Sequence, residues 1–167
     1  MTAIDDVLEA NRRYAARFTE GGLPGLPPSR RLAVVTCMDS RMHVSKLLGL
    51  ELGAAHIIRN AGGVVTEDVL RSLIISHHLG GTEEFMIINH TKCALLGCSD
   101  EALAARLRQA TGKQAEAPAH FHGFGDLEEN VREQIRTLRS HPWIPATIPV
   151  RGFVYDVDTG RLSEVSA

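Results

Sequence analysis

Short apolar runs, separated by stretches of helical periodicity, form the main pattern of hydrophobic and polar positions along this chain. The runs at about 31–36 and 84–89 are continuous, as burial on both faces of a parallel sheet requires. A further strand is predicted at 55–58. The last strand, near 150–156, alternates between apolar and polar residues and turns at 158–160 into a short final strand, which predicts an antiparallel edge.

Apolar residues at three- and four-residue steps predict helices between these strands and before the first one. The predicted helices cover residues 3–18, 43–50, 66–79, 99–110 and 126–139. Because strands and helices alternate, we predict a three-layer α/β fold with a central, mainly parallel sheet, helices on both faces and an antiparallel edge strand. Ligand sites of such sheets lie beyond the carboxyl ends of the strands.

The first helix is separable from the rest of the chain. Residues 21–28 read Gly-Gly-Leu-Pro-Gly-Leu-Pro-Pro, a stiff connector that cannot continue a helix. We predict a single domain over residues 1–167. Within it, the helix and connector at 1–28 pack either on their own domain or on a second copy of the chain.

Composition and charge exclude several classes of function. Eighteen Lys and Arg residues against 20 Asp and Glu residues give a net charge of −2 without a basic stripe, so no nucleic acid partner is expected. No apolar run approaches the roughly 18–20 residues that span a bilayer, so no membrane partner is expected. Acidic residues stand near the N-terminus where a signal peptide needs basic ones, which indicates a cytoplasmic protein.

Three cysteines, an odd count, favour metal binding or inert burial over a disulfide framework.

Two of the cysteines follow the continuous apolar runs. Cys37 comes directly after the first run, and His90 and Cys93 follow the run at 84–89. If these strands are neighbours, two thiolates and one imidazole converge at one edge of the sheet, and this donor set suits zinc better than magnesium or calcium. Three protein ligands leave one tetrahedral position open for catalysis. The alternative is that the cysteines are core residues and the histidine is a satisfied polar group.

Asp39 and Arg41 lie in the same predicted loop as Cys37. Paired hydrogen bonds from a guanidinium keep a carboxylate ionised by lowering its pKa. The carboxylate of Asp39 can then accept the proton of a zinc-bound hydroxide and orient its oxygen toward a small electrophile such as carbon dioxide. If Arg41 releases Asp39, the carboxylate can itself occupy the fourth zinc position and exclude water. The alternative is a surface ion pair.

These motifs resemble a known family. Cys37-x-Asp39-x-Arg41 together with His90-x-x-Cys93 is similar to the signature of the β-class carbonic anhydrases, closest to the small single-domain type of bacteria and archaea. Further stretches are also similar, so that the resemblance covers roughly residues 30–160: Arg59-Asn60-Ala61-Gly62-Gly63, Gly81-Thr82-Glu83-Glu84-Phe85 and Pro149-Val150-Arg151-Gly152-Phe153-Val154-Tyr155.

The resemblance implies a carbonate dehydratase that uses zinc, one ion per chain, to interconvert carbon dioxide and bicarbonate. It implies a homodimer in which the N-terminal helix lies across the partner, and it leaves open whether dimers pair into tetramers. By this resemblance the zinc ligands are Cys37, His90 and Cys93. The catalytic pair is Asp39 and Arg41, and Asp39 is also the conditional fourth ligand of the zinc. Gly62 and Gly63 form the wall of the substrate pocket.

Two residues depart from the family pattern. Lys92 stands where an acidic residue is common and adds positive charge near the thiolates. Ala94 stands where glycine is common and where the backbone could need glycine's freedom. Two other functions therefore stay open: a zinc hydrolase acting on carbon disulfide or carbonyl sulfide, and a zinc-binding regulatory homologue with little turnover. A thiol enzyme is disfavoured, because neither a Cys-x5-Arg loop nor a Cys-x-x-Cys pair is present.

Overall fold

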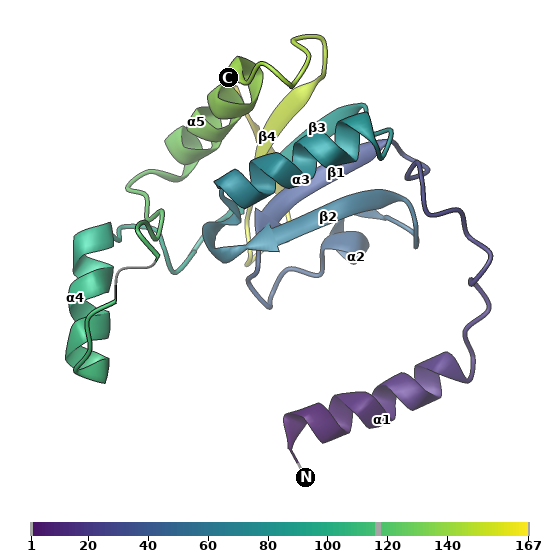
Figure 1. Ribbon diagram of the computed structural model, residues 1–167, viewed down its shortest axis with the longest axis horizontal. Helices are drawn as coiled ribbons and strands as arrows, with labels where there is room; N and C mark the ends of the chain where they lie inside the picture. The colour runs from purple at the N-terminus through teal and green to yellow at the C-terminus, as the bar shows by residue number, and fades with distance from the viewer. Residues whose placement is uncertain (1, 116–117, 167) are drawn as a thin grey trace.

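A five-stranded sheet forms the centre of the computed structural model, which describes residues 2–115 and 118–166 (Figure 1). The strand order is β2-β1-β3-β4-β5; β5 pairs with β4 in the antiparallel sense, and all other pairs are parallel. The predicted, mainly parallel sheet with an antiparallel edge strand is therefore confirmed. The strands are β1 (Leu32–Cys37), β2 (Ala55–Asn60), β3 (Glu84–His90), β4 (Val150–Tyr155) and β5 (Leu162–Val165).

Helices alternate with these strands much as the periodicity predicts. They are α1 (Ala3–Ala15), α2 (Val44–Leu48), α3 (Glu67–His78), α4 (Asp100–Thr111) and α5 (Leu127–Ser140), with a 3-10 turn, η1, at Ala61–Gly63. The caps of α3, α4 and α5 are Thr66, Ser99 and Asp126, whose side chains accept a hydrogen bond from the backbone three residues later. The helix predicted at 43–50 is shorter, because Gly49 ends α2 with a φ of +62°. Within the described residues, no helix is both long and apolar enough to cross a membrane.

The sheet separates two hydrophobic layers. Val35 of β1 and Ile87 of β3 pack on the face that α3 and α5 cover (Figure 1). Their neighbours Val34 and Ile88 pack on the opposite face, together with residues of α2. Consecutive strand residues point to opposite faces, so each buried strand needs apolar side chains throughout. Helices thus lie on both faces of the sheet, which confirms the three-layer prediction.

The strand register brings the ends of β1, β2 and β3 to one edge. Cys37, the last residue of β1, lies opposite Asn60, the last residue of β2. Thr36 lies opposite Ile88, so β3 continues two residues further to end at His90. β1 and β3 are neighbours in the sheet although β2 and α3 lie between them in the chain. The residues that follow the two apolar runs therefore lie side by side.

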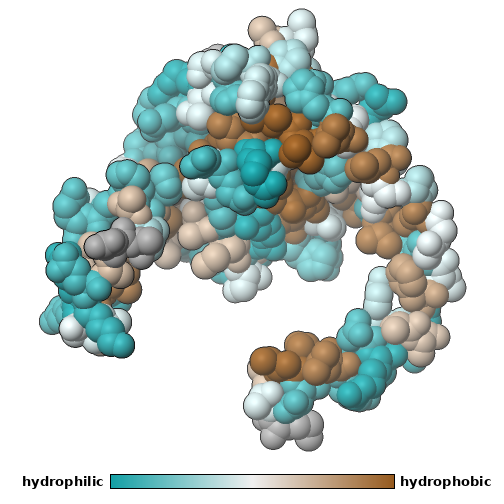
Figure 2. Space-filling model, viewed as in Figure 1, coloured by the Kyte–Doolittle hydropathy of each residue, from teal (hydrophilic) through white to brown (hydrophobic). Residues whose placement is uncertain are grey.

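α1 stands apart from the sheet (Figure 1). It begins with a capping box, in which Thr2 and Asp5 exchange side-chain and backbone hydrogen bonds, and it ends at Ala15, earlier than the predicted residue 18. None of its residues is buried. Figure 2 shows hydrophobic residues gathered along one side of α1. The exposed large apolar side chains of this helix are Ile4, Val7, Leu8 and Tyr14.

Candidate metal centre

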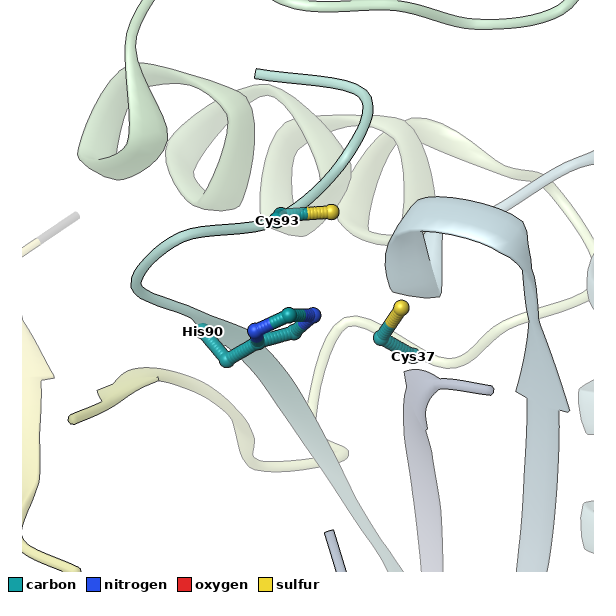
Figure 3. A group of neighbouring side chains, drawn as sticks. All are labelled: Cys37, His90 and Cys93. Carbon is teal, nitrogen blue, oxygen red and sulfur yellow. The ribbon is translucent and has the colours of Figure 1, made fainter. Parts of the chain in front are cut away.

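Three ligand-type side chains converge at the carboxyl edge of the sheet. Figure 3 shows Cys37 at the end of β1, His90 at the end of β3 and Cys93 in the following turn pointing toward one another. One ligand atom from each lies within 4.8 Å of the others. Their exposed fractions are 5%, 0% and 7%, so the cluster is shielded from water.

The turn after β3 is what returns Cys93 to the strand ends. Lys92 adopts a left-handed backbone with φ of +56°, which reverses the chain directly before Cys93. The N–H of Thr91 donates to the carbonyl of Tyr155 at 2.9 Å and extends the pairing of β3 with β4 beyond the strand. Two neighbouring strands and one tight turn thus position all three side chains.

His90 is poised to bind a cation. Its Nδ1 lies 2.8 Å from the carbonyl oxygen of Thr91. Because a carbonyl only accepts, Nδ1 carries the proton and Nε2 presents a lone pair. Nε2 is buried without a hydrogen-bond partner, a costly arrangement for a polar atom. A metal ion held together with the two sulfurs would satisfy this atom, and the mixed sulfur and imidazole donor set fits zinc.

The two sulfurs interact strongly with each other. A hydrogen bond with the Cys93 thiol is the main cause that lowers the pKa of Cys37, and backbone hydrogen bonds from Asp39 and Gly62 lower it further against the effect of burial. The same bond between the sulfurs, together with burial, raises the pKa of Cys93. Burial lowers the pKa of His90, but the neighbouring Cys37 sulfur and the bond from Nδ1 to the Thr91 carbonyl outweigh burial and raise it. Two close sulfurs that compete for one proton are a suitable site for a cation.

Asp39 and Arg41 form a bidentate ion pair beside this cluster. Nε of Arg41 donates to Oδ1 of Asp39 at 2.9 Å, and Nη2 donates to Oδ2 at 2.7 Å. Oδ2 also lies 3.8 Å from Nε2 of His90, so the carboxylate borders the ligand atoms. Nη2 of Arg41 donates further to the carbonyl of Lys92 at 3.1 Å, which links the pair to the turn that carries Cys93.

The ion pair keeps Asp39 charged. The side-chain hydrogen bonds from Arg41, followed by the bond from its backbone N–H, hold the pKa of Asp39 well below its ordinary value. Asp39 is therefore a carboxylate at neutral and mildly acidic pH and can only accept hydrogen bonds. Its side chain is 19% exposed, compared with 46% for Arg41, so the acceptor lies at the inner end of the pair.

Gly62 and Gly63 lie directly against β1. Both have left-handed backbones, with φ of +82° and +62°. A Cβ on Gly63 would lie 2.6 Å from the backbone nitrogen of Cys37, so no side chain fits there. A Cβ on Gly62 would meet Leu95 and Val64 at 3.0 Å each. The turn therefore runs between the metal-type ligands and a group of apolar side chains.

The two departures from the family pattern do not disturb this geometry. Ala94 is exposed and is not among the residues with a left-handed backbone, so position 94 does not need glycine's freedom. The chain reverses at Lys92 and Gly97 instead, with φ of +56° and +78°. Nζ of Lys92 lies 2.6 Å from Oδ2 of Asp158, and its side chain is 61% exposed. The lysine charge is therefore paired at the surface.

Sequence reasoning missed the polar side chains that support the site. Arg59 donates through Nε to the carbonyl of Cys37 at 3.0 Å and through Nη2 to the carbonyl of Asp39 at 2.7 Å. Asn60 and Asn89 hold the glycine turn through their side-chain amides. The signal available in the sequence was a polar amide, Asn89, at the end of an otherwise apolar run, and the structure shows this amide to be fully buried.

Comparisons with known proteins place this geometry in context. A family profile described as "Carbonic anhydrase" matches residues 32–162. The chain is 42% identical over 167 residues to beta-carbonic anhydrase 1 of Mycobacterium tuberculosis, a match that covers 99% of each chain. It is 35% identical over 181 residues to the carbon disulfide hydrolase of an Acidianus strain, covering 95% of this chain and 87% of that one. The crystal structure of carbonic anhydrase from Streptococcus mutans superposes with a TM-score of 0.92, 44% identity and 99% coverage of both chains.

Proposed function

The chain belongs to the β-carbonic anhydrase family, and on that premise we propose that it catalyses the reversible hydration of carbon dioxide to bicarbonate. The cofactor is zinc, one ion per chain, and the residues that would hold it are Cys37, His90 and Cys93. When bound, zinc supplies Lewis acidity, which makes a water molecule acidic near pH ~7. The remaining tasks are to orient that water, to admit the substrate and to exclude bulk solvent.

Asp39 orients the attacking water. As a carboxylate it accepts the water's hydrogen bond and so fixes the direction of the oxygen lone pairs. Arg41 keeps the carboxylate ionised and in place through two parallel hydrogen bonds. We further propose that Asp39 is a conditional fourth ligand. Its Oδ2 lies 3.8 Å from Nε2 of His90, so a carboxylate released by Arg41 would be free to join the three proposed ligands.

Gly62 and Gly63 form one wall of the proposed substrate pocket. The apolar neighbours of Gly62 are Val64, Leu95 and Phe124, which a Cβ at that position would meet at 3.0, 3.0 and 3.6 Å. Carbon dioxide is small and carries no charge, so an apolar wall admits it and disfavours excess water. The glycines keep the wall open, because any side chain at either position would fill the space or displace β1.

One observation carries the proposal. Nε2 of His90 is fully buried and has no hydrogen-bond partner, although it lies in a cluster with two sulfurs and beside a carboxylate. An unsatisfied buried nitrogen is expensive in a folded protein, unless a metal ion is its partner. The neighbouring carboxylate of Asp39, whose Oδ2 lies 3.8 Å from this nitrogen, already has both oxygens engaged by Arg41.

The test combines metal analysis with a stopped-flow assay of carbon dioxide hydration on protein purified without chelators. We expect one zinc per chain and hydration that rises with pH. A protein with no zinc, or with zinc and no hydration at any pH, would overturn the proposal.

A second candidate reaction is the hydrolysis of carbon disulfide or carbonyl sulfide. Carbon disulfide hydrolases are 35%, 31% and 32% identical to this chain over 95% of its length. Sulfide release from either compound, measured beside carbon dioxide hydration on the same preparation, distinguishes the reactions. A zinc-binding regulatory homologue is the third alternative; it predicts full zinc occupancy with no turnover of any of these substrates.

The proposal includes an assembly and a location. We take residues 1–167 as a single β-carbonic-anhydrase-like domain that acts as a homodimer, in which the N-terminal helix and connector at 1–28 pack on the partner. The exposed apolar side of α1 supports this assembly. A cytoplasmic location is supported by the three free cysteines, since two proposed ligands must stay reduced. Sedimentation of the zinc protein tests the dimer and also reports any pairing of dimers into tetramers.

A further inference from the structure

The last two residues of β3 send their side chains to opposite faces of the sheet. His90 joins Cys37 and Cys93, while Asn89 points toward α5. Asn89 is fully buried, and its two partners on α5, Asn130 and Gln134, are 8% and 3% exposed. A group of three buried amides is unusual in a layer that is mostly apolar.

Every polar atom of the Asn89 side chain is used. Its Nδ2 donates to the carbonyls of Gly62 and Gly63 at 3.0 and 3.1 Å. Its Oδ1 accepts from Nδ2 of Asn130 at 2.8 Å and from Nε2 of Gln134 at 3.2 Å. The amide therefore links α5 to the glycine turn, and its orientation is fixed by donors on one side and acceptors on the other.

The Gly62–Gly63 turn needs hydrogen bonds from a fixed side chain to hold its backbone in place. Two consecutive glycines with left-handed backbones have more conformational freedom than any other residue pair. The turn is also pressed against the metal-type ligands, since a Cβ on Gly63 would lie 2.6 Å from the nitrogen of Cys37. The backbone of Gly62 helps to lower the pKa of Cys37, which fits a turn that lies close to this residue. A tilt of the turn would change both its contact with Cys37 and the width of the proposed pocket.

We propose that Asn89, held by Asn130 and Gln134, is a positioning residue that sets the Gly62–Gly63 turn against Cys37. Helix α5 thereby controls the environment of one metal ligand from the opposite face of the sheet. The inference rests on the proposed function, because it takes Cys37 as a zinc ligand.

The competing explanation is that the three amides only fill space and stabilise the core. The two explanations differ in what an isosteric change would alter. A filler affects stability alone, whereas a positioning residue also affects the electronic environment of the metal and the mobility of the turn.

The experiment compares Asn89→Leu with Thr82→Val as a matched control. Thr82 is also fully buried, and its Oγ1 bonds Ser76 at 2.7 Å, in a network that does not touch the metal centre. Each protein is studied with zinc and with cobalt(II) in its place. The readouts are kcat/KM, the visible and sulfur-to-cobalt absorption bands, and amide hydrogen exchange of residues 62–65 in the metal-free protein.

For Asn89→Leu we expect one metal per chain, shifted cobalt bands, faster exchange at 62–65 and a fall in kcat/KM of about 10- to 100-fold, the range typical of residues that orient a metal ligand. Thr82→Val should lose stability and keep the wild-type bands, exchange and kcat/KM. Wild-type bands and exchange in Asn89→Leu would overturn the inference.

A second variant keeps the inference testable if Asn89→Leu does not fold. Asn130→Leu removes only one bond to Oδ1 of Asn89 and leaves the turn's own contacts in place. We expect the cobalt absorption bands to shift in the same direction as in Asn89→Leu but by less, because the effect must pass through Asn89. Unchanged bands contradict the proposal. A wild-type protein that binds one metal but does not hydrate carbon dioxide would count against the proposed function alone, since the bands and the exchange still report on Asn89.

Discussion

The carboxyl edge of the sheet and the helix α1 differ in how much of each is completed within one chain. At the edge, Cys37, His90 and Cys93 are buried and held by strand pairing and a tight turn. α1 has a complete capping box and an apolar side, yet none of its residues is buried. Local signals are thus sufficient to define a helix of 13 residues, but a helix of this length is marginal alone in water. The ligand cluster is therefore complete within a single chain, whereas the apolar side of α1 is left exposed by its own chain.

The largest effect is expected at the edge, from Cys37→Ser. Serine is a poor zinc ligand of nearly the same size, so the fold should persist while zinc is lost and carbon dioxide hydration falls to the uncatalysed rate. The matched control is Cys98→Ser, since Cys98 is outside the ligand cluster. Metal analysis and stopped-flow hydration check the pair. Equal zinc content in the two variants would show that Cys37 is not a ligand.

Asp39→Asn should have the next largest effect. The amide keeps the shape but offers an N–H where the water's hydrogen bond must be accepted, so turnover should fall about 100-fold, as for other proton-handling groups, with zinc retained. Because the Arg41 guanidinium holds the pKa of Asp39 well below its ordinary value, protonation of Asp39 should not limit the wild-type rate at mildly acidic pH. Unchanged turnover in the variant would remove Asp39 from the mechanism.

Leu8→Glu tests whether the apolar side of α1 packs on a second copy of the chain. If this helix packs on a partner, each dimer loses two buried leucines at about 1.5–3 kcal/mol each, which weakens the dimer at least about 100-fold. Ala16→Glu is the control, because residue 16 caps the C-terminal end of α1, is exposed and receives the same charge, but is not one of the apolar residues of the helix that would pack on a partner. Sedimentation over a range of concentrations measures both proteins. Equal dissociation of the two variants, or none, would contradict packing through the apolar side.

The smallest effects are expected from Lys92→Met and Ala94→Gly. Lys92 makes an exposed ion pair with Asp158, which contributes about 0–1 kcal/mol. Ala94 does not have a left-handed backbone, so glycine has nothing to relieve there. Hydration rates should therefore stay within about twofold of wild type for both variants, since neither side chain reaches the reacting groups. A large gain in rate from Ala94→Gly would mean that the turn is distorted after all.

Much of the fold and of the site could be predicted from sequence because the relevant signals are local. Apolar runs define β1 and β3, and the ligand residues directly follow or end them. What could not be predicted depends on contacts between distant segments. The bonds from Asn89 to α5 join residues 41 and 45 positions apart, and no periodicity encodes them. The turn after β3 was also beyond reach, since the left-handed residue is Lys92 although glycine is the usual choice.

The separation of the ligands along the chain has a consequence for how the protein acquires its ion. Cys37 belongs to β1, and His90 and Cys93 stand at and after the end of β3, with β2 and α3 between them. In a nascent or unfolded chain, bringing Cys37 to His90 and Cys93 costs loop-closure entropy, because a long open segment joins them. Zinc binding by the proposed ligands is therefore favoured once the sheet has formed, and the bound ion would raise the free energy of unfolding by mass action.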